Sequence, residues 1–266
     1  MTQEQELSTQ TINKMRTAMR KKQSFLLTVT GNTSNFTVNL DRVIEFFPDI
    51  DYEIALRRFE SYNSIYNVTS VNNQFKYFNG TVNRTITIPP GAYEINAINT
   101  EIQRQMVLFG DYTSGATGNT FSINISGNVS TLKTVITLAN GYTVDFTIAN
   151  SLINILGFTA QVLNAPYNSS TNIVNIQNFN FILANTDLCI GSYINSTSSQ
   201  TLFVFSSNPV PAGYKISIEP YDPIYLPVTS YKRNITDFRV WITDENMNPI
   251  SFNGENITIV FHIQSV

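Results

Sequence analysis

Short apolar runs, many of them alternating with polar residues, begin at residue 25 and recur to the end of the chain. Side chains at i and i+2 of a strand point to the same face, so this period predicts strands with one buried face. We expect strands at residues 25–29, 36–40, 52–59, 65–71, 85–88, 121–125, 173–183, 201–205, 214–218, 237–242 and 257–263. This many short strands separated by turns is typical of a mainly β protein.

A central block, residues 91–164, interrupts the strand pattern. Apolar residues recur there at helical spacing, at Ile95, Ile98, Ile102 and Met106. This spacing predicts a helix with Asn96 as its N-terminal cap and Gly110 as its end. Residues 151–158 predict a second, short helix.

The Asn140-Gly141 pair is the strongest hairpin signal in the chain, because it lies between two alternating runs. Both residue types tolerate the positive φ that two-residue hairpin turns require. We therefore expect the runs on either side of it to pair with each other. Asn253-Gly254 predicts a second tight turn for the same reason.

The strands on both sides of the central block predict one sandwich with an insertion. In a jelly roll, strands distant in sequence pair across two sheets. We expect a mainly all-β fold, a jelly-roll β-sandwich with a mixed α+β insertion subdomain. The expected limits are a basic N-terminal arm at 1–22, the sandwich at 23–90 and 165–266, and the insertion at 91–164.

The arm differs from everything after it, since it is polar at first and then basic. Two interpretations remain open: a frayed terminus, or a segment that orders on a neighbouring subunit or contacts nucleic-acid phosphates. The candidate assembly or nucleic-acid residues are Lys14, Arg16, Arg20, Lys21 and Lys22.

The composition favours association with other protein surfaces, because few charged side chains are available to keep the surface solvated. The chain is 42% hydrophobic but only 13% charged, so Asn, Thr and Ser supply most of its polar surface. A net charge of -3 indicates neither a nucleic acid nor an anionic membrane as a partner of the whole chain. The start lacks an apolar signal region, and no apolar run is long enough to predict a membrane span.

Catalytic residue types are scarce. His262, the only histidine, is flanked by Phe261 and Ile263 in a predicted strand, so we expect it on the opposite face from them. Cys189, the only cysteine, has apolar neighbours and is predicted to be a buried thiol, which also fits a reducing compartment at synthesis. Glycine-rich phosphate loops are absent from the sequence. We expect no enzyme, no catalytic residue, no metal and no cofactor.

One group of carboxylates leaves a choice. Asp49, Asp51 and Glu53 alternate, so in an extended segment they lie on one side and resemble a calcium site. Arg57 and Arg58 follow in the same stretch and favour ion pairs instead. Of the two interpretations, we prefer the ion pairs.

Aromatic residues also gather in one stretch, at Tyr62, Tyr66, Phe75, Tyr77 and Phe78. Such residues serve as core, as subunit contacts or as a carbohydrate-binding platform. The sequence leaves these three uses open.

Three parts of the chain together resemble a known family. They are ITIPPGAYEINAINTEIQ at 86–103, SLINILGF at 151–158, and a C-terminal run from GYKISIEPYDPIYLPV at 213–228 to ITDENMNPISFNGENITIVFHI at 242–263. Their order and spacing resemble the penton, or minor capsid, proteins of Polinton-like elements, adintoviruses and virophages. The resemblance covers roughly residues 84–263.

This resemblance implies a jelly-roll protein that forms homopentamers at the fivefold vertices of an icosahedral virion. It implies partners in the protein itself and a major capsid protein, and a place at the capsid vertex after synthesis in the host cytoplasm or nucleus. The basic arm adds encapsidated DNA as a candidate partner. The alternative hypothesis is a viral attachment or glycan-binding β-sandwich, based on the aromatic residues and turns.

Overall fold

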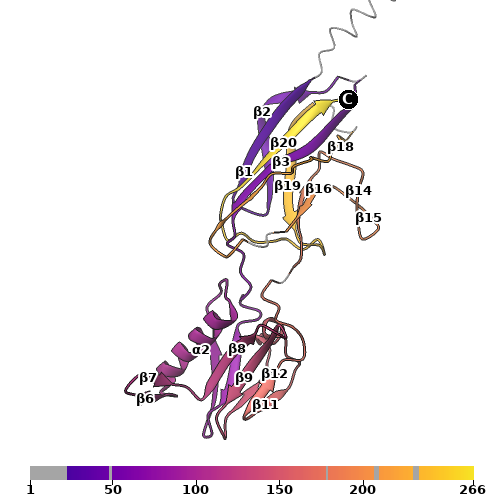
Figure 1. Ribbon diagram of the computed structural model, residues 1–266. Coiled ribbons are helices and arrows are strands. Elements are labelled where there is room, and N and C mark those ends of the chain that lie inside the picture. The colour runs from indigo at the N-terminus through magenta and orange to yellow at the C-terminus, as the bar shows by residue number, and fades with distance from the viewer. Residues whose placement is uncertain (1–22, 48–49, 178, 207–209, 230–233) are drawn as a thin grey trace, which may run out of the picture. The chain divides into compact units, whose positions relative to one another are not determined.

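The computed structural model describes residues 23–47, 50–177, 179–206, 210–229 and 234–266 (Figure 1). The chain divides into two compact units. Unit 1 consists of Met1–Asn63 and Phe181–Val266, and unit 2 is the continuous segment Ser64–Asn180 between them.

Two antiparallel sheets form unit 1. The first has the order β1 (Ser24–Gly31), β20 (Ile257–Ser265), β3 (Tyr52–Tyr62) and β17 (Lys215–Ile218), with β18 (Leu226–Pro227) also paired to β3. The second has the order β16 (Thr201–Phe205), β13 (Ile182–Thr186), β19 (Asn234–Thr243) and β2 (Asn35–Glu45). The short strands β14 (Ser192–Ile194) and β15 (Thr197–Ser199) form a separate hairpin.

This strand order is that of a jelly roll. The eight strands that make up these two orders are, along the chain, β1, β2, β3, β13, β16, β17, β19 and β20. Numbered 1 to 8 in that sequence, they give the order 1-8-3-6 in the first sheet and 5-4-7-2 in the second. Pairing of the first strand with the last, and of the second with the seventh, brings distant segments together as a jelly roll requires. The predicted fold class is confirmed.

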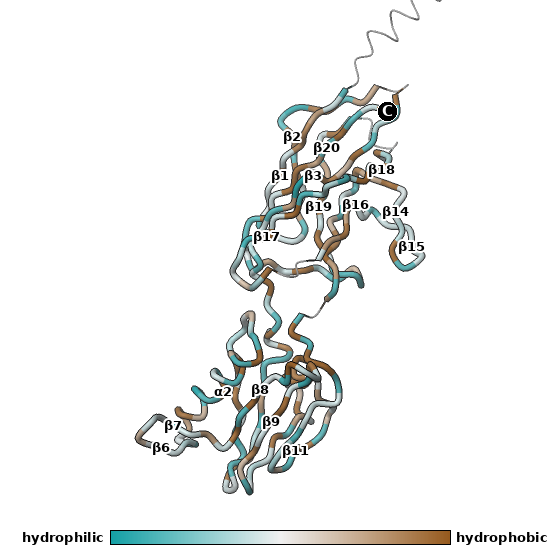
Figure 2. Tube along the Cα trace, viewed as in Figure 1, coloured by the Kyte–Doolittle hydropathy of each residue, from teal (hydrophilic) through white to brown (hydrophobic). Residues whose placement is uncertain are grey.

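Alternation along the strands explains why the two sheets pack. In β20 the odd-numbered residues from Ile257 to Ser265 are buried and the residues between them are partly exposed. Figure 2 shows the same alternation of hydrophobic and hydrophilic positions along strands of both units. Phe261 of the first sheet meets Phe238 of the second with ring centroids 6.1 Å apart, so these residues lie in the core between the sheets.

Unit 2 has its own core between two further sheets and a helix. One sheet has the order β11 (Val162–Asn164), β10 (Thr143–Asp145), β4 (Gln74–Phe78), β5 (Asn83–Thr87), and the other β12 (Tyr167–Ser169), β9 (Lys133–Leu138), β8 (Ile123–Asn128). The helices are α2 (Ile95–Phe109) and the short α3 (Ile153–Leu156), and β6 (Thr113–Gly115) pairs with β7 (Gly118–Thr120).

The predicted helix is confirmed, with one correction. Its four predicted apolar residues are the buried ones, and Gly110 ends it in the left-handed conformation. The cap is Glu94, without a side-chain cap hydrogen bond, and Asn96 lies inside the helix on its exposed side. The carbonyl of Asn96 accepts a hydrogen bond from the hydroxyl of Thr100 instead.

The boundaries of the insertion also differ from those expected. Residues 64–90 and 165–180, which the sequence assigned to the sandwich, belong to unit 2. Strand β4 pairs with β5 and β10, and β12 pairs with β9, so the strands in both segments find their partners inside the insertion. Alternation predicts that a strand exists but not which strand completes its ladder.

The expected hairpin at Asn140-Gly141 is wrong. The strands on either side, β9 and β10, belong to different sheets and do not pair with each other. Only Gly141 has a positive φ, at 85°, and the amide of Tyr142 donates to the carbonyl of Ala139. A single positive φ at the third position is the geometry of a type II turn, which does not continue the twist of a two-residue hairpin.

Two predicted strands are also shorter in the structure than in the prediction. Residues 65–71 contain only an isolated bridge from Val68 to Gly91. Of residues 173–183, only the end enters a strand, since β13 begins at Ile182. Both segments lie where the chain passes between units, so their apolar residues pack without joining a ladder.

Candidate functional site

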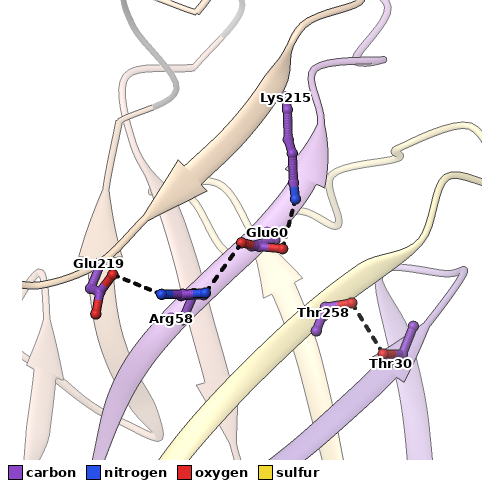
Figure 3. Close-up of polar contacts among 6 residues, drawn as sticks. All are labelled: Thr30, Arg58, Glu60, Lys215, Glu219 and Thr258. Atoms are coloured by element: carbon purple, nitrogen blue, oxygen red, sulfur yellow. Dashed lines mark hydrogen bonds and ion pairs between the residues drawn. The ribbon is translucent and has the colours of Figure 1, made fainter.

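The outer face of the β1-β20-β3-β17 sheet has charged side chains near β17 and neutral side chains near β1. Near β17, four alternating charges form an exposed ladder (Figure 3). Lys215 Nζ lies 2.8 Å from Glu60 Oε2, Arg58 Nη1 lies 3.8 Å from Glu60 Oε1, and Arg58 Nη2 lies 3.0 Å from Glu219 Oε2. The hydrogen bond from Lys215 is the main cause that lowers the pKa of Glu60. The ladder is electrically balanced and lies on one side of the sheet.

On the other side of the same face, the residues are neutral. Thr30 of β1 and Thr258 of β20 share a hydrogen bond of 3.1 Å between their hydroxyls (Figure 3). Leu26 of β1 is 64% exposed, although it is a large aliphatic residue. The sequence contains no charged residue from Gln23 to Leu40, which includes all of β1. This half of the face is therefore suited to contact with another protein surface.

A second neutral element lies at the opposite edge of unit 1. The sequence from Leu188 to Tyr214 has no charged residue and includes the β14-β15 hairpin. Tyr193 of this hairpin is 70% exposed, and the two turn residues Asn195 and Ser196 both have positive φ. This hairpin was not predicted from the sequence. Asn195, a residue that tolerates the left-handed region, was the available signal.

His262 lies where alternation predicts, partly exposed between the buried Phe261 and Ile263. Its Nε2 lies 2.7 Å from the hydroxyl of Ser24, and its Nδ1 lies 2.5 Å from the hydroxyl of Tyr225. In a Ser-His-Asp arrangement, the second ring nitrogen instead donates to a carboxylate. Here both nitrogens meet hydroxyl groups, and the side chain joins β1, β20 and the segment before β18.

Cys189 is fully buried, as predicted. Its Sγ lies 3.3 Å from the carbonyl oxygen of Gln200, and burial raises the pKa of the thiol to about 12. A thiol with such a pKa remains protonated at neutral pH and is a poor nucleophile.

The carboxylates of Asp49, Asp51 and Glu53, considered above as a calcium site, are not seen together as one cluster among the described residues. Asp49 lies outside the described residues, and Glu53 accepts a hydrogen bond of 2.6 Å from the side-chain amide of Gln264. Arg58 bonds to Glu219 and lies near Glu60, not to this group, so the expected ion pair with Arg58 is wrong. Within the described part of the chain, no group of three or more His, Cys, Asp or Glu side chains is placed to hold a metal ion.

The aromatic residues of the 62–78 stretch do not form one platform. Tyr62 belongs to unit 1 and is 48% exposed. In unit 2, Phe75 and Tyr77 are core residues with no exposed surface, while Tyr66 is 40% exposed. Two of the five, Phe75 and Tyr77, therefore serve the core, one of the three uses that the sequence left open.

The basic arm residues lie outside the described residues, so their assembly or nucleic-acid role stays a prediction. They are Lys14, Arg16, Arg20, Lys21 and Lys22. Among the described helices, none combines the length and the apolar character needed to cross a membrane.

Strand order and sequence together define a class: a single jelly roll with an insertion between its third and fourth strands and a charge-free strand or hairpin at each of two opposite edges. Among solved structures, the chain is similar to the selenomethionine-labelled mavirus penton protein, with 13% identity and a TM-score of 0.48. The similarity covers 92% of this chain and 100% of that chain.

No protein-family model matches the sequence, and no curated protein matches it.

Proposed function

We propose that this protein is a minor capsid protein that forms homopentamers at the fivefold vertices of an icosahedral virion. The observation that carries the proposal is the jelly roll with a charge-free strand, β1, and a charge-free hairpin, β14-β15, at opposite edges. A ring of identical copies needs two different surfaces on each copy, one that binds forward and one that binds backward. The sequence motifs at 86–103 and 213–263 add support because they resemble those of penton proteins.

A major capsid protein is the second partner in this proposal. A vertex protein must contact the surrounding shell as well as its own copies, and the charge-free segments 23–40 and 188–214 of unit 1 suit both kinds of contact. The N-terminal arm is the candidate contact with encapsidated DNA, since its cations are close together. The protein would then reside at the virion vertex.

The test is assembly of the full chain. Purified protein at increasing concentration should form a species of five copies in mass photometry and fivefold rings in negative-stain images. Co-expression with the major capsid protein should give particles with density for this chain at the vertices. A chain that stays monomeric at high concentration and is absent from such particles would contradict the proposal.

Glycan binding by unit 2 is the second candidate function. Tyr66 and Tyr167 are 40% and 58% exposed, and an exposed tyrosine offers a ligand both an apolar ring and a hydroxyl group. A glycan array probed with the full chain tests this candidate. Binding that is lost in Tyr66→Ala or Tyr167→Ala would favour attachment, and no binding to any glycan would remove it.

A further inference from the structure

The four edge strands of unit 1 differ in how they are protected from pairing with another chain. Edge strands normally carry charges, prolines, bulges or short lengths, which prevent unwanted strand addition. Strand β17 has four residues and includes Lys215. Strand β2 carries Asp41, Arg42 and Glu45, and its register against β19 is irregular. Strand β16 has five residues and lies beside the β14-β15 hairpin.

Strand β1 has none of these devices. It pairs with β20 in continuous register from Ser24 to Gly31, over eight residues that include neither a charge nor a proline. Leu26 and Thr28 are exposed on its outer face, while Phe25 and Leu27 are only partly buried on its inner face. Among the described residues, only β20 pairs with β1, so its other edge presents a row of backbone groups flanked by neutral side chains, which is the arrangement that accepts another strand.

The β14-β15 hairpin has the properties of a strand that could be accepted. It contacts β16, at the edge of the second sheet opposite to β2. Because β1 contacts β2, the hairpin and the free edge of β1 lie at opposite edges of unit 1. Its turn has positive φ at both Asn195 and Ser196, the geometry of a two-residue hairpin, so the hairpin is well defined before it binds.

We infer that the free edge of β1 in one copy receives the β14-β15 hairpin of the next copy. This inference rests on the proposed function, since it names the contact that would close the ring. The two elements lie at opposite edges, so each copy offers one and uses the other, as a heterologous closed ring requires. Both elements are free of charge, so their contact leaves no charged side chain buried without a partner. Leu26 and Tyr193 supply exposed apolar surface beside the paired backbones.

Cysteine cross-linking tests the partners of this contact. Thr28 and Ser198 are exposed, and the buried Cys189 is a poor thiol for competing reactions. Thr28→Cys and Ser198→Cys chains with different tags, co-expressed and then oxidised, should form a mixed disulfide dimer. Either variant alone should form none. A chain with both substitutions should give a series of disulfide-linked oligomers, from dimer up to pentamer, on a non-reducing gel.

A charge substitution tests whether the contact drives assembly. Leu26→Lys places a charge on the outer face of β1, and because the side chain is 64% exposed the substitution should leave the fold of unit 1 intact. We expect the concentration at half assembly to rise about a hundredfold or more. Val129→Lys, at a residue of unit 2 that is 89% exposed, is the matched control and should have no effect.

The outcomes separate this inference from the proposed function. Pentamers that form normally with Leu26→Lys and give no mixed disulfide would overturn the β1 contact and leave the vertex function standing. Disulfide dimers of Thr28→Cys alone would show β1 pairing with β1 of another copy, and would also overturn it. A protein that never leaves the monomeric state would overturn both.

Discussion

The Asp111 network of unit 2 and the Glu60 ladder of unit 1 differ in how far their charged groups are buried. In unit 2, the side chain of Asp111 is only 10% exposed. Its carboxylate accepts hydrogen bonds from the Tyr77 hydroxyl at 2.5 Å and from the Asn79 side-chain amide at 2.7 Å. Arg84 Nε lies 3.6 Å from the same group. In unit 1, the ladder around Glu60 is on the outer face, with Lys215 50% exposed.

This difference shows which interactions each unit depends on. The Asp111 network fastens the end of α2 to the β4-β5 hairpin from inside, and burial with Asp111 as a hydrogen-bond partner raises the pKa of Tyr77. Removing a partner from such a network leaves other buried groups unpaired. An exposed ladder loses little when one member is removed, because water replaces it. We therefore expect the stability of unit 1 to depend on its apolar core and on buried hydrogen bonds such as those of Asn185 with Thr201 and Thr243, and little on the exposed ladder.

The largest expected effect is in the core of unit 1. Phe59 has no exposed surface and its ring lies 4.6 Å from that of Phe205 and 6.1 Å from that of Phe252. Phe59→Ala should lower the free energy of unfolding by about 3–5 kcal/mol. Urea unfolding combined with hydrogen exchange should show the loss in unit 1. Phe47→Ala, at a residue that is 55% exposed, is the control and should change little. Equal loss of protection in unit 2 would show that the two units unfold together.

Asp111→Ala should destabilise unit 2 by about 3 kcal/mol, because the Tyr77 hydroxyl and the Asn79 amide lose their acceptor and Arg84 loses its ion-pair partner. Thermal unfolding and hydrogen exchange of α2 measure this change. Asp111→Asn keeps one acceptor oxygen and should cost less. If the alanine variant is as stable as the native chain, the internal network does not hold unit 2 together and the comparison fails.

A pair of glycines separates backbone strain from close contact in unit 2. Gly157 has φ +73°, and a Cβ there would lie 2.6 Å from the carbonyl oxygens of Asn172 and Ile173. Gly110 has φ +76° with open space around it. Gly110→Ala should cost about 1 kcal/mol from the left-handed backbone alone. Gly157→Ala should cost about 2 kcal/mol or more, and equal losses in urea unfolding would contradict the close contact.

Acid should weaken unit 2 through Asp145. The hydrogen bond from Lys76 is the main cause that lowers the pKa of this carboxyl from 3.8 to about 2. Because the pKa of Asp145 is lower in the folded state than in the unfolded state, its charged form stabilises the fold at pH values above 3.8. This contribution disappears as the pH falls from 3.8 to about 2. With allowance for solvent screening, we expect about 1 kcal/mol. Asp145→Asn should lose that amount at pH 5 but match the native chain near pH 2; a constant difference across this range would contradict the assignment.

The smallest expected effect is on the ladder of unit 1. Glu60→Ala removes the partner of both Lys215 and Arg58, yet the side chains are exposed enough for water to solvate them. The free energy of unfolding should change by less than about 1 kcal/mol, and less still at high salt. A loss as large as that of Asp111→Ala would remove the distinction between the units.

Local patterns predicted the elements well where one face of an element is buried. The alternation of β20 and the helical spacing of α2 both arise from a single buried face, and both are visible in the sequence alone. The jelly roll followed from the number of strands on each side of the insertion. The sequence also predicted the burial of Cys189, from the apolar neighbours on both sides.

Pairing between strands was the part that the sequence did not predict. The turn at Asn140-Gly141 has hairpin residues, yet β9 and β10 pair with other strands, because the core of unit 2 places them in two sheets. The boundary of unit 2 failed for the same reason, since β4 and β12 complete ladders inside it. The β14-β15 hairpin was missed because it buries no apolar face and so gives no periodic signal.

The pairing of β1 with β20 also orders events in time. Ser24 aligns with Gln264, so the first sheet needs the end of the described chain before its central pair can form. Unit 2 is a continuous segment, so all of its strands are synthesised before β13 of unit 1. Contacts so distant in sequence form slowly. During synthesis the charge-free β1 therefore remains without its partner β20, and other nascent chains can contact it.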